Sequence, residues 1–139
     1  MEPEQIIDDI ICGLRIYPNI EFHRNKPHEL QILGSGRDGF NIQIYTGYRE
    51  HLIYLDDFHW HFGNNEQENT EMHDLIIKAL FGKIRIQILA YNGTEFKWIL
   101  QRQEDGNWID EMITGTFNRN FHRTPNIYYR QNSFSDKDS

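Results

Sequence analysis

Two histidines separated by one residue mark the first place in this chain where chemistry could occur. His59 and His61 alternate with Phe58, Trp60 and Phe62. Successive side chains of a β-strand point to opposite faces, so the two imidazoles would share one face and the three aromatic rings the other. Paired imidazoles can bind a metal ion, or they can hydrogen-bond with neighbouring strands and solvent in an ordinary sheet. Both interpretations remain open, and we expect the aromatic face to be buried beneath a helix.

Two short segments resemble pieces of the metal-binding motifs of the cupin family. The first reads His-x-His-x4-Glu and ends at Glu66, and the second reads His-x3-Asn from His122 to Asn126. The resemblance implies a metal held by His59, His61 and Glu66 in a small β-barrel with dioxygenase or isomerase chemistry. The flanking glycines and the proline of the second cupin motif are absent, and Glu66 opens a predicted helix. A small metal-dependent enzyme is therefore the alternative function, while our leading interpretation has no metal and no cofactor.

Several polar side chains are positioned to join the histidine pair. Asp56 and Asp57 fall at a predicted bend just before it, which makes them the best candidate carboxylates. A C-terminal segment around His122 and Arg123 is rich in arginine and aromatic residues, which are enriched at interaction hot spots. The candidate binding pocket consists of His59, His61, Asp56, Asp57, His122 and Arg123.

Composition and charge restrict the classes of function. A chain of 139 residues can bury one core, and an aromatic content of 14% favours sheets over helical bundles. The formal net charge of −7 repels phosphate backbones, so we expect no nucleic-acid partner. Residues 1–5 lack the apolar run of a secretory signal, and no run approaches the ~20 apolar residues that cross a bilayer. The single cysteine, Cys12, cannot form a disulfide within the chain, which is consistent with a reducing compartment. We therefore expect a cytoplasmic protein without a membrane partner.

Two segments carry the patterns of amphipathic helices. The first begins at Pro3, has Gly13 near its end and places apolar residues at helical spacing: Ile6, Ile7, Ile10, Ile11 and Leu14. The second spans about residues 66–81, with a capping box from Asn65 to Glu68 and with Gly82 at its C-terminus. Its buried stripe comprises Met72, Leu75, Ile76, Ala79 and Leu80.

The remaining chain is typical of strands. The N-terminal half contains Ile20–His23, Glu29–Leu33, Phe40–Tyr45 and a long, bent segment, His51–Phe62. The C-terminal half contains Lys83–Tyr91, Glu95–Gln103, Asn107–Phe117 and a last strand at Ile127–Arg130.

The C-terminal half predicts an antiparallel meander. Asn92-Gly93 and Asp105-Gly106 favour two-residue type I′ turns, which fix the register of the strands they join. Counting back from these turns pairs Trp98 with Ile113 and Ile86 with Ile99, so we expect Trp98 to be buried. One face then carries an apolar strip, and such a strip, if uncovered, predicts a homodimer or a bound partner. The strip consists of Ile84, Ile86, Ile88, Ile99 and Met112.

These elements predict an α+β fold with a mainly antiparallel sheet of six to seven strands and two helices packed on one face. Residues 1–132 form a single domain, and residues 133–139 are a polar tail that we expect to be frayed.

A series of short motifs resembles a group of small bacterial proteins that have no assigned activity. The motifs are His-Trp-His-Phe, Phe-Lys-Trp, Asp-Gly-Asn-Trp, Thr-Gly-Thr-Phe and Tyr-Tyr-Arg-Gln-Asn, within residues 59–132. The resemblance implies a bacterial single-domain protein. Our leading hypothesis is a non-catalytic binding protein that acts on a protein partner. A small acidic domain of this kind could neutralise a basic partner such as a secreted nuclease toxin, as immunity proteins do.

Overall fold

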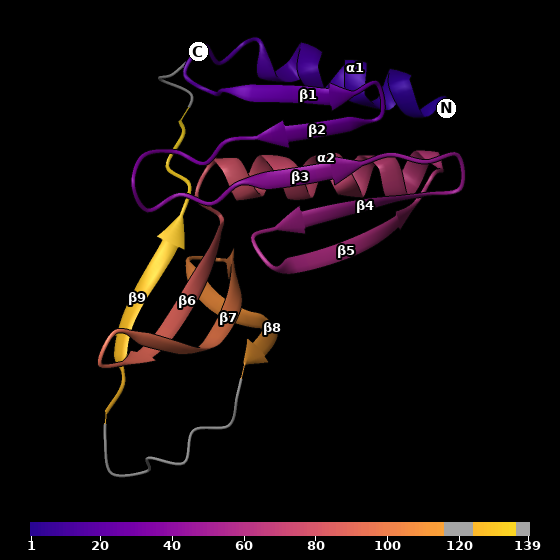
Figure 1. Ribbon diagram of the computed structural model, residues 1–139. Coiled ribbons are helices and arrows are strands. Elements are labelled where there is room, and N and C mark those ends of the chain that lie inside the picture. The colour runs from indigo at the N-terminus through magenta and orange to yellow at the C-terminus, as the bar shows by residue number, and fades with distance from the viewer. Residues whose placement is uncertain (116–123, 136–139) are drawn as a thin grey trace.

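The computed structural model describes residues 1–115 and 124–135. Within these ranges the chain forms two helices and nine antiparallel strands in two sheets (Figure 1). The helices are α1 (Pro3–Leu14) and α2 (Glu66–Leu80). In spatial order, the first sheet contains β1 (Phe22–Lys26), β2 (Glu29–Ile32), β3 (Ile42–Tyr45), β4 (Glu50–Leu55) and β5 (Phe58–Gly63). The second contains β8 (Asn107–Gly115), β7 (Thr94–Glu104), β6 (Ile84–Tyr91) and β9 (Asn126–Gln131).

The predicted α+β class is confirmed, but the strands do not form a single sheet of six to seven. The segment predicted as one bent strand is the β4–β5 hairpin, which reverses at Asp56 and Asp57. Asp56 has a φ of 55°, in the left-handed region that aspartate tolerates better than most residues. The C-terminal strands pair only with one another. Both helices lie on one side of the first sheet, as predicted, because their buried residues share one core with the inward-facing side chains of its strands. Figure 1 shows α1 alongside β1 and α2 behind β3.

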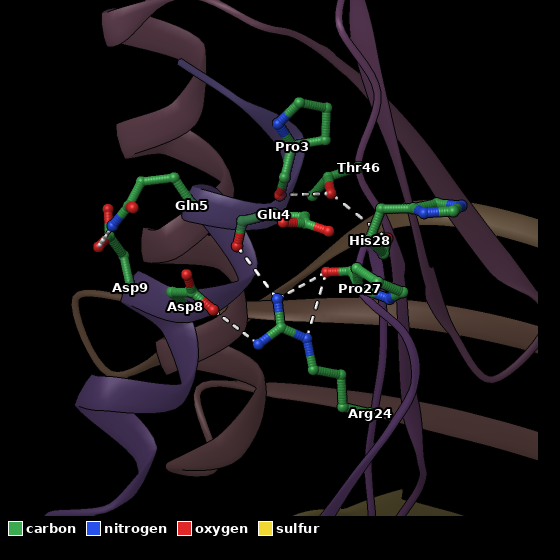
Figure 2. A network of polar contacts seen from close by, with 9 residues as sticks. All are labelled: Pro3, Glu4, Gln5, Asp8, Asp9, Arg24, Pro27, His28 and Thr46. Carbon is green, nitrogen blue, oxygen red and sulfur yellow. Dashed lines mark hydrogen bonds and ion pairs between the residues drawn. The ribbon is translucent and has the colours of Figure 1, made fainter.

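An apolar stripe and a polar network hold α1 against the first sheet. Pro3 occupies the first turn of α1, where a backbone N–H would have no carbonyl of the helix to bind. The missing N–H of proline therefore removes no hydrogen bond. The apolar residues of the helix are buried: Ile6, Ile7, Ile10, Ile11 and Leu14. Arg24 of β1 reaches α1 with Nη1 2.6 Å from an Asp8 oxygen, and its Nη2 donates to the Glu4 carbonyl (Figure 2). Thr46 donates to the Pro3 carbonyl at 2.9 Å, which fixes the start of the helix.

The N-cap predicted at Asn65 is confirmed, but the reciprocal bond of a full capping box is not formed, because the Asn65 N–H donates to the Gly63 carbonyl. Asn65 accepts the backbone N–H of Glu68 through Oδ1 at 2.9 Å. Hydrogen bonds from the Gly63 backbone and the Asn65 side chain lower the pKa of the Glu68 carboxyl. Gly82, with a φ of 78°, follows the helix in the left-handed conformation predicted there. Neither α1 nor α2, the helices of the described residues, is long and apolar enough to cross a membrane.

Both predicted type I′ turns are present in the second sheet. Asn92 and Gly93 have φ values of 48° and 81°, and Asp105 and Gly106 have 51° and 80°. Positive φ at both central residues is the property that defines this turn and matches the twist of the strands it joins. The register directly beside each turn is the one that the sequence predicts.

Further from the turns, a β-bulge in each hairpin shifts the register by one residue. The shifts lie between Leu89 and Ala90, and between Leu100 and Gln101. A bulge places two residues of one strand opposite one of the other. Every pair beyond it therefore differs from the prediction, and side chains expected on one face can lie on the other.

The predicted pairs of Trp98 with Ile113 and of Ile86 with Ile99 were wrong for this reason. Ile86 pairs with Leu100, and Ile99 pairs with Ile113 on the opposite face. Trp98 is half-buried and packs against the core, whereas Ile113 is 59% exposed.

The apolar strip predicted as a dimer interface belongs to the interior of the protein. Ile84, Ile86 and Ile88 have no exposed surface and share one core with both helices and the first sheet. Met112 packs against the same core, while Ile99 lies on the other face of the second sheet. This strip therefore offers no surface for a second copy of the chain.

The C-terminal end of β9 joins the two sheets. Asn132 is fully buried, and its side chain binds the loop between β2 and β3 at Ser35 and Phe40. The next two residues are also held, because the Ser133 N–H donates to Ser35 Oγ and the Phe134 N–H to the last carbonyl of α2. The predicted frayed tail thus does not begin at residue 133, and residues 136–139 lie outside the described part of the chain.

Candidate functional site

The histidine pair lies on the open face of the first sheet. His59 and His61 are exposed, their ring centroids are 5.7 Å apart, and the ring of Tyr54 lies 5.4 Å from that of His59. His61 Nδ1 is 3.7 Å from a Glu50 oxygen, and 58% of the His61 side chain is exposed. On the other face of β5 the three aromatic residues pack into the core, as predicted, with Phe58 fully buried.

The structure does not gather the other predicted residues around this pair. Asp56 accepts from Arg130 of β9 at 2.6 Å, in a contact that ties the β4–β5 turn to the second sheet. Asp57 is exposed at the same turn. His122 and Arg123 lie outside the described residues.

The metal site suggested by the cupin resemblance is not assembled in the described structure. Glu66 begins α2 and lines a cavity on the helix-bearing side of the first sheet, whereas His59 and His61 alternate with core residues and face the opposite side. Across residues 1–115 and 124–135, no group of three histidine, cysteine, aspartate or glutamate side chains could hold a metal ion. The histidine pair is thus part of a solvent-exposed sheet face, with Tyr54 beside His59.

A more enclosed feature lies between the helices, and we call it the α1–α2 groove. It consists of two adjoining cavities that share Asp9 and His73. The first, of about 590 Å³, contains most of the polar lining residues, including Asn65, Glu66 and Thr70, and for that reason we call it the polar end. The second, of about 320 Å³, is the apolar end, which is lined chiefly by Ile10, Leu14, Tyr17, Ile76, Ile77 and Leu80. Concave sites that are mostly apolar with a few polar groups are typical binding sites.

The apolar end exposes hydrophobic side chains to solvent. Ile77 is 54% exposed on α2, and Ile16, just beyond α1, is 61% exposed. Single exposed apolar residues are common on protein surfaces, but here they border a continuous apolar depression. Such a depression is stabilised when another apolar surface covers it.

Carboxylates give the polar end a negative character. Asp9 accepts from the Gln5 amide at 3.0 Å and keeps lone pairs for a further donor, and Glu66 is exposed at the start of α2. Burial lowers the pKa of His73, against the opposing effect of Asp9, so the imidazole is neutral at neutral pH. Among residues 1–115 and 124–135, no lysine or arginine lines either cavity.

A buried histidine supports the polar end from below. His51 Nδ1 accepts the Gly47 N–H at 3.2 Å, which leaves the proton on Nε2 to donate to Asn69 Oδ1 at 2.8 Å. The Asn69 amide donates in turn to Asn64 Oδ1. Burial lowers the pKa of His51, so the neutral ring links β4 to α2 and fixes Asn69 in the groove wall.

The fold and the groove define a class: an α+β domain with two antiparallel sheets and an open cleft between two helices. Comparisons with known proteins do not place it in a family. No protein-family model, no curated protein and no solved structure matches the chain.

Proposed function

We propose that this protein is a non-catalytic binding protein and that the α1–α2 groove holds part of a basic protein partner. The observation that supports this most directly is the composition of the groove. Its described lining residues are apolar at one end, and at the other they include carboxylates but no lysine or arginine. A partner with apolar side chains and a positive charge complements both ends.

The charge of the whole chain favours the same class of partner. A formal net charge of −7 accelerates association with a basic protein and disfavours acidic ones. Proteins that bind phosphate backbones present clustered lysine and arginine. A nuclease toxin is therefore a fitting basic partner, and the proposed role is that of an immunity-type protein that neutralises it.

The test compares two double variants, one altered in the α1–α2 groove and one altered on the open face of the first sheet. Asp9→Asn with Ile77→Ser changes the charge and the apolar wall of the groove, and both positions tolerate exchange because Asn still accepts from Gln5 and Ile77 is 54% exposed. His59→Ala with His61→Ala changes the open face of the first sheet instead. Each protein is used to capture partners from the organism that encodes it, followed by mass spectrometry.

We expect a basic protein to be retained by the unaltered chain and by the histidine variant, and to be lost from the groove variant. Raising the salt concentration should weaken the retention, because exposed charges are screened. For the immunity-type role, the retained protein should have nuclease activity that the unaltered chain inhibits. Equal retention by the groove variant would refute the proposed site, and a partner lost only from the histidine variant would move it to the open face.

A further inference from the structure

Gly13 is a glycine that the fold of this chain does not require. It lies within α1 near its C-terminal end, its φ is not positive, and a Cβ built on it would meet no atom within 4 Å. Glycine within a helix makes the helix less stable than alanine does, because glycine loses more backbone freedom on folding. Gly13 lines the apolar end of the α1–α2 groove, so at this point the wall is bare backbone. Glycine allows another backbone to come close.

The walls of the groove restrict what kind of segment can bind there. An extended peptide gains affinity mainly through main-chain hydrogen bonds to a free strand edge. Both walls here are helices, whose interior backbone groups are already paired. A bound segment must therefore satisfy its own backbone and contribute side-chain packing, which is the property of an α-helix.

The dimensions and spacing of the lining residues also suit a helix. On α2 the groove is lined at helical spacing by Glu66, Thr70, His73, Ile77 and Phe81. The 15 residues of α2 span about 22 Å, at 1.5 Å per residue. Packed helices lie about 8–10 Å apart, and small residues at the crossing point favour the closer distances.

The α1 wall is fixed before any partner arrives. In Figure 2, Asp8 points to the Arg24 guanidinium, while Asp9 lies with Gln5 away from that network. Arg24 also donates to the Pro27 carbonyl at 2.7 Å, which ties α1 to the β1–β2 turn. Because the wall is already ordered, binding costs less conformational entropy there.

We propose that the α1–α2 groove binds an amphipathic, basic α-helix of the partner, which crosses α1 at Gly13. This inference rests on the proposed function and specifies the element of the partner that is recognised. The apolar side chains of the helix fill the depression bounded by Leu14 and Ile77. A lysine or arginine near one end of the helix reaches the carboxylates of Asp9 and Glu66.

A synthetic peptide tests this chemistry without knowledge of the natural partner. The probe is a capped 16-residue peptide of leucine, lysine and alanine, with leucine at positions i, i+4, i+7 and i+11. Two peptides serve as comparisons: a scrambled sequence of the same composition, and the same pattern with glutamate in place of lysine. Affinity is measured by fluorescence anisotropy, and the binding site is mapped by shifts of backbone amide resonances.

The matched variants are Gly13→Ala and Cys12→Ala, which add or change a small side chain at neighbouring positions of α1. Cys12 is exposed and is not among the groove-lining residues. We expect the lysine peptide to bind in the groove and the two comparison peptides not to bind. Gly13→Ala should weaken binding by about tenfold or more, as overpacking at a close contact does. The same substitution should raise or preserve the midpoint of urea unfolding, whereas Cys12→Ala should leave affinity unchanged.

Failure of this inference can be distinguished from failure of the proposed function. If the lysine peptide does not bind, or binds equally when scrambled or after Gly13→Ala, the helix inference is wrong. The proposed function still stands in that case if the natural partner is lost from the Asp9→Asn, Ile77→Ser variant. If the natural partner binds that variant as well as it binds the unaltered chain, both proposals fall.

Discussion

Replacing Asn132 with alanine should strongly destabilise the protein. The Asn132 side chain has no exposed surface and makes three hydrogen bonds to the β2–β3 loop. Its Oδ1 accepts the N–H groups of Ser35 and Phe40 at 3.0 and 3.1 Å, and its Nδ2 donates to the Phe40 carbonyl at 3.1 Å. Alanine removes all three bonds and leaves their backbone partners without a substitute.

The size of the effect follows from which partners water can reach. The bond to Ser35 is only partly buried, so solvent can replace it, whereas both bonds to Phe40 are buried. A buried polar group left unpaired costs about 1–3 kcal/mol, so the two Phe40 groups together cost about 2–6 kcal/mol. Domains are stabilised by only about 5–15 kcal/mol, which makes this a large fraction of the total.

Urea unfolding followed by tryptophan fluorescence measures the loss. With a denaturant slope of about 2 kcal/mol/M, Asn132→Ala should lower the midpoint by about 1–3 M. Asn107→Ala is the matched control, because Asn107 is exposed at the start of β8 and should change stability by less than about 0.5 kcal/mol. If Asn132→Ala shifts the midpoint no further than Asn107→Ala, the bonds to Phe40 do not join the sheets as described.

Two further predictions concern pH and the shifted register. Because burial lowers the pKa of His51 and of His73 below 6.5, the unfolded chain binds protons that the folded chain does not. The free energy of unfolding should therefore be highest above pH 6.5 and fall as the pH decreases towards 5. His51→Phe should make this pH dependence less steep by up to about 1.4 kcal/mol per pH unit. If urea unfolding gives the same pH dependence for both proteins, the lowered pKa of His51 is contradicted. Ile86→Ala should lower the free energy of unfolding by about 2–5 kcal/mol, because Ile86 is fully buried. Ile113→Ala should lower it by less than about 1 kcal/mol, because that side chain is 59% exposed. Equal losses in urea unfolding would instead support the register predicted without bulges.

Local chemistry made the helix ends and tight turns predictable from the sequence. The Asn65 cap and the Asn92-Gly93 turn each depend on residues within a few positions of the chain. The local sequence is therefore sufficient to predict both structures. The Asp56-Asp57 reversal was predicted only as a bend, because neither residue is a glycine and Asp56 must adopt a positive φ. Local patterns therefore located the turn but not its angle.

The bulges and the groove depend on interactions that no short pattern contains. The bulge beside Leu100 has no turn residues to mark it, yet it determines which face Ile99 and Ile113 occupy. The alternation around His59 did predict which side chains would be exposed. The groove was not predicted, because its width depends on how far apart two distant helices lie on the sheet; the signs of it in the sequence were Gly13 within a helix and Ile77 outside the buried stripe.

The long separation in sequence between Asn132 and its partner in the β2–β3 loop has a consequence for synthesis of the chain. Phe40 and its partner Asn132 are separated by 92 residues. A ribosome adds about 5–20 residues per second, so about 5–18 s pass between the synthesis of Phe40 and that of Asn132. During this interval the β2–β3 loop lacks the side chain that binds it. During that time β6 also lacks β9, and an unpaired strand edge can pair with other chains. Until β9 has been synthesised, the edge of β6 that it covers is therefore open to pairing with another chain.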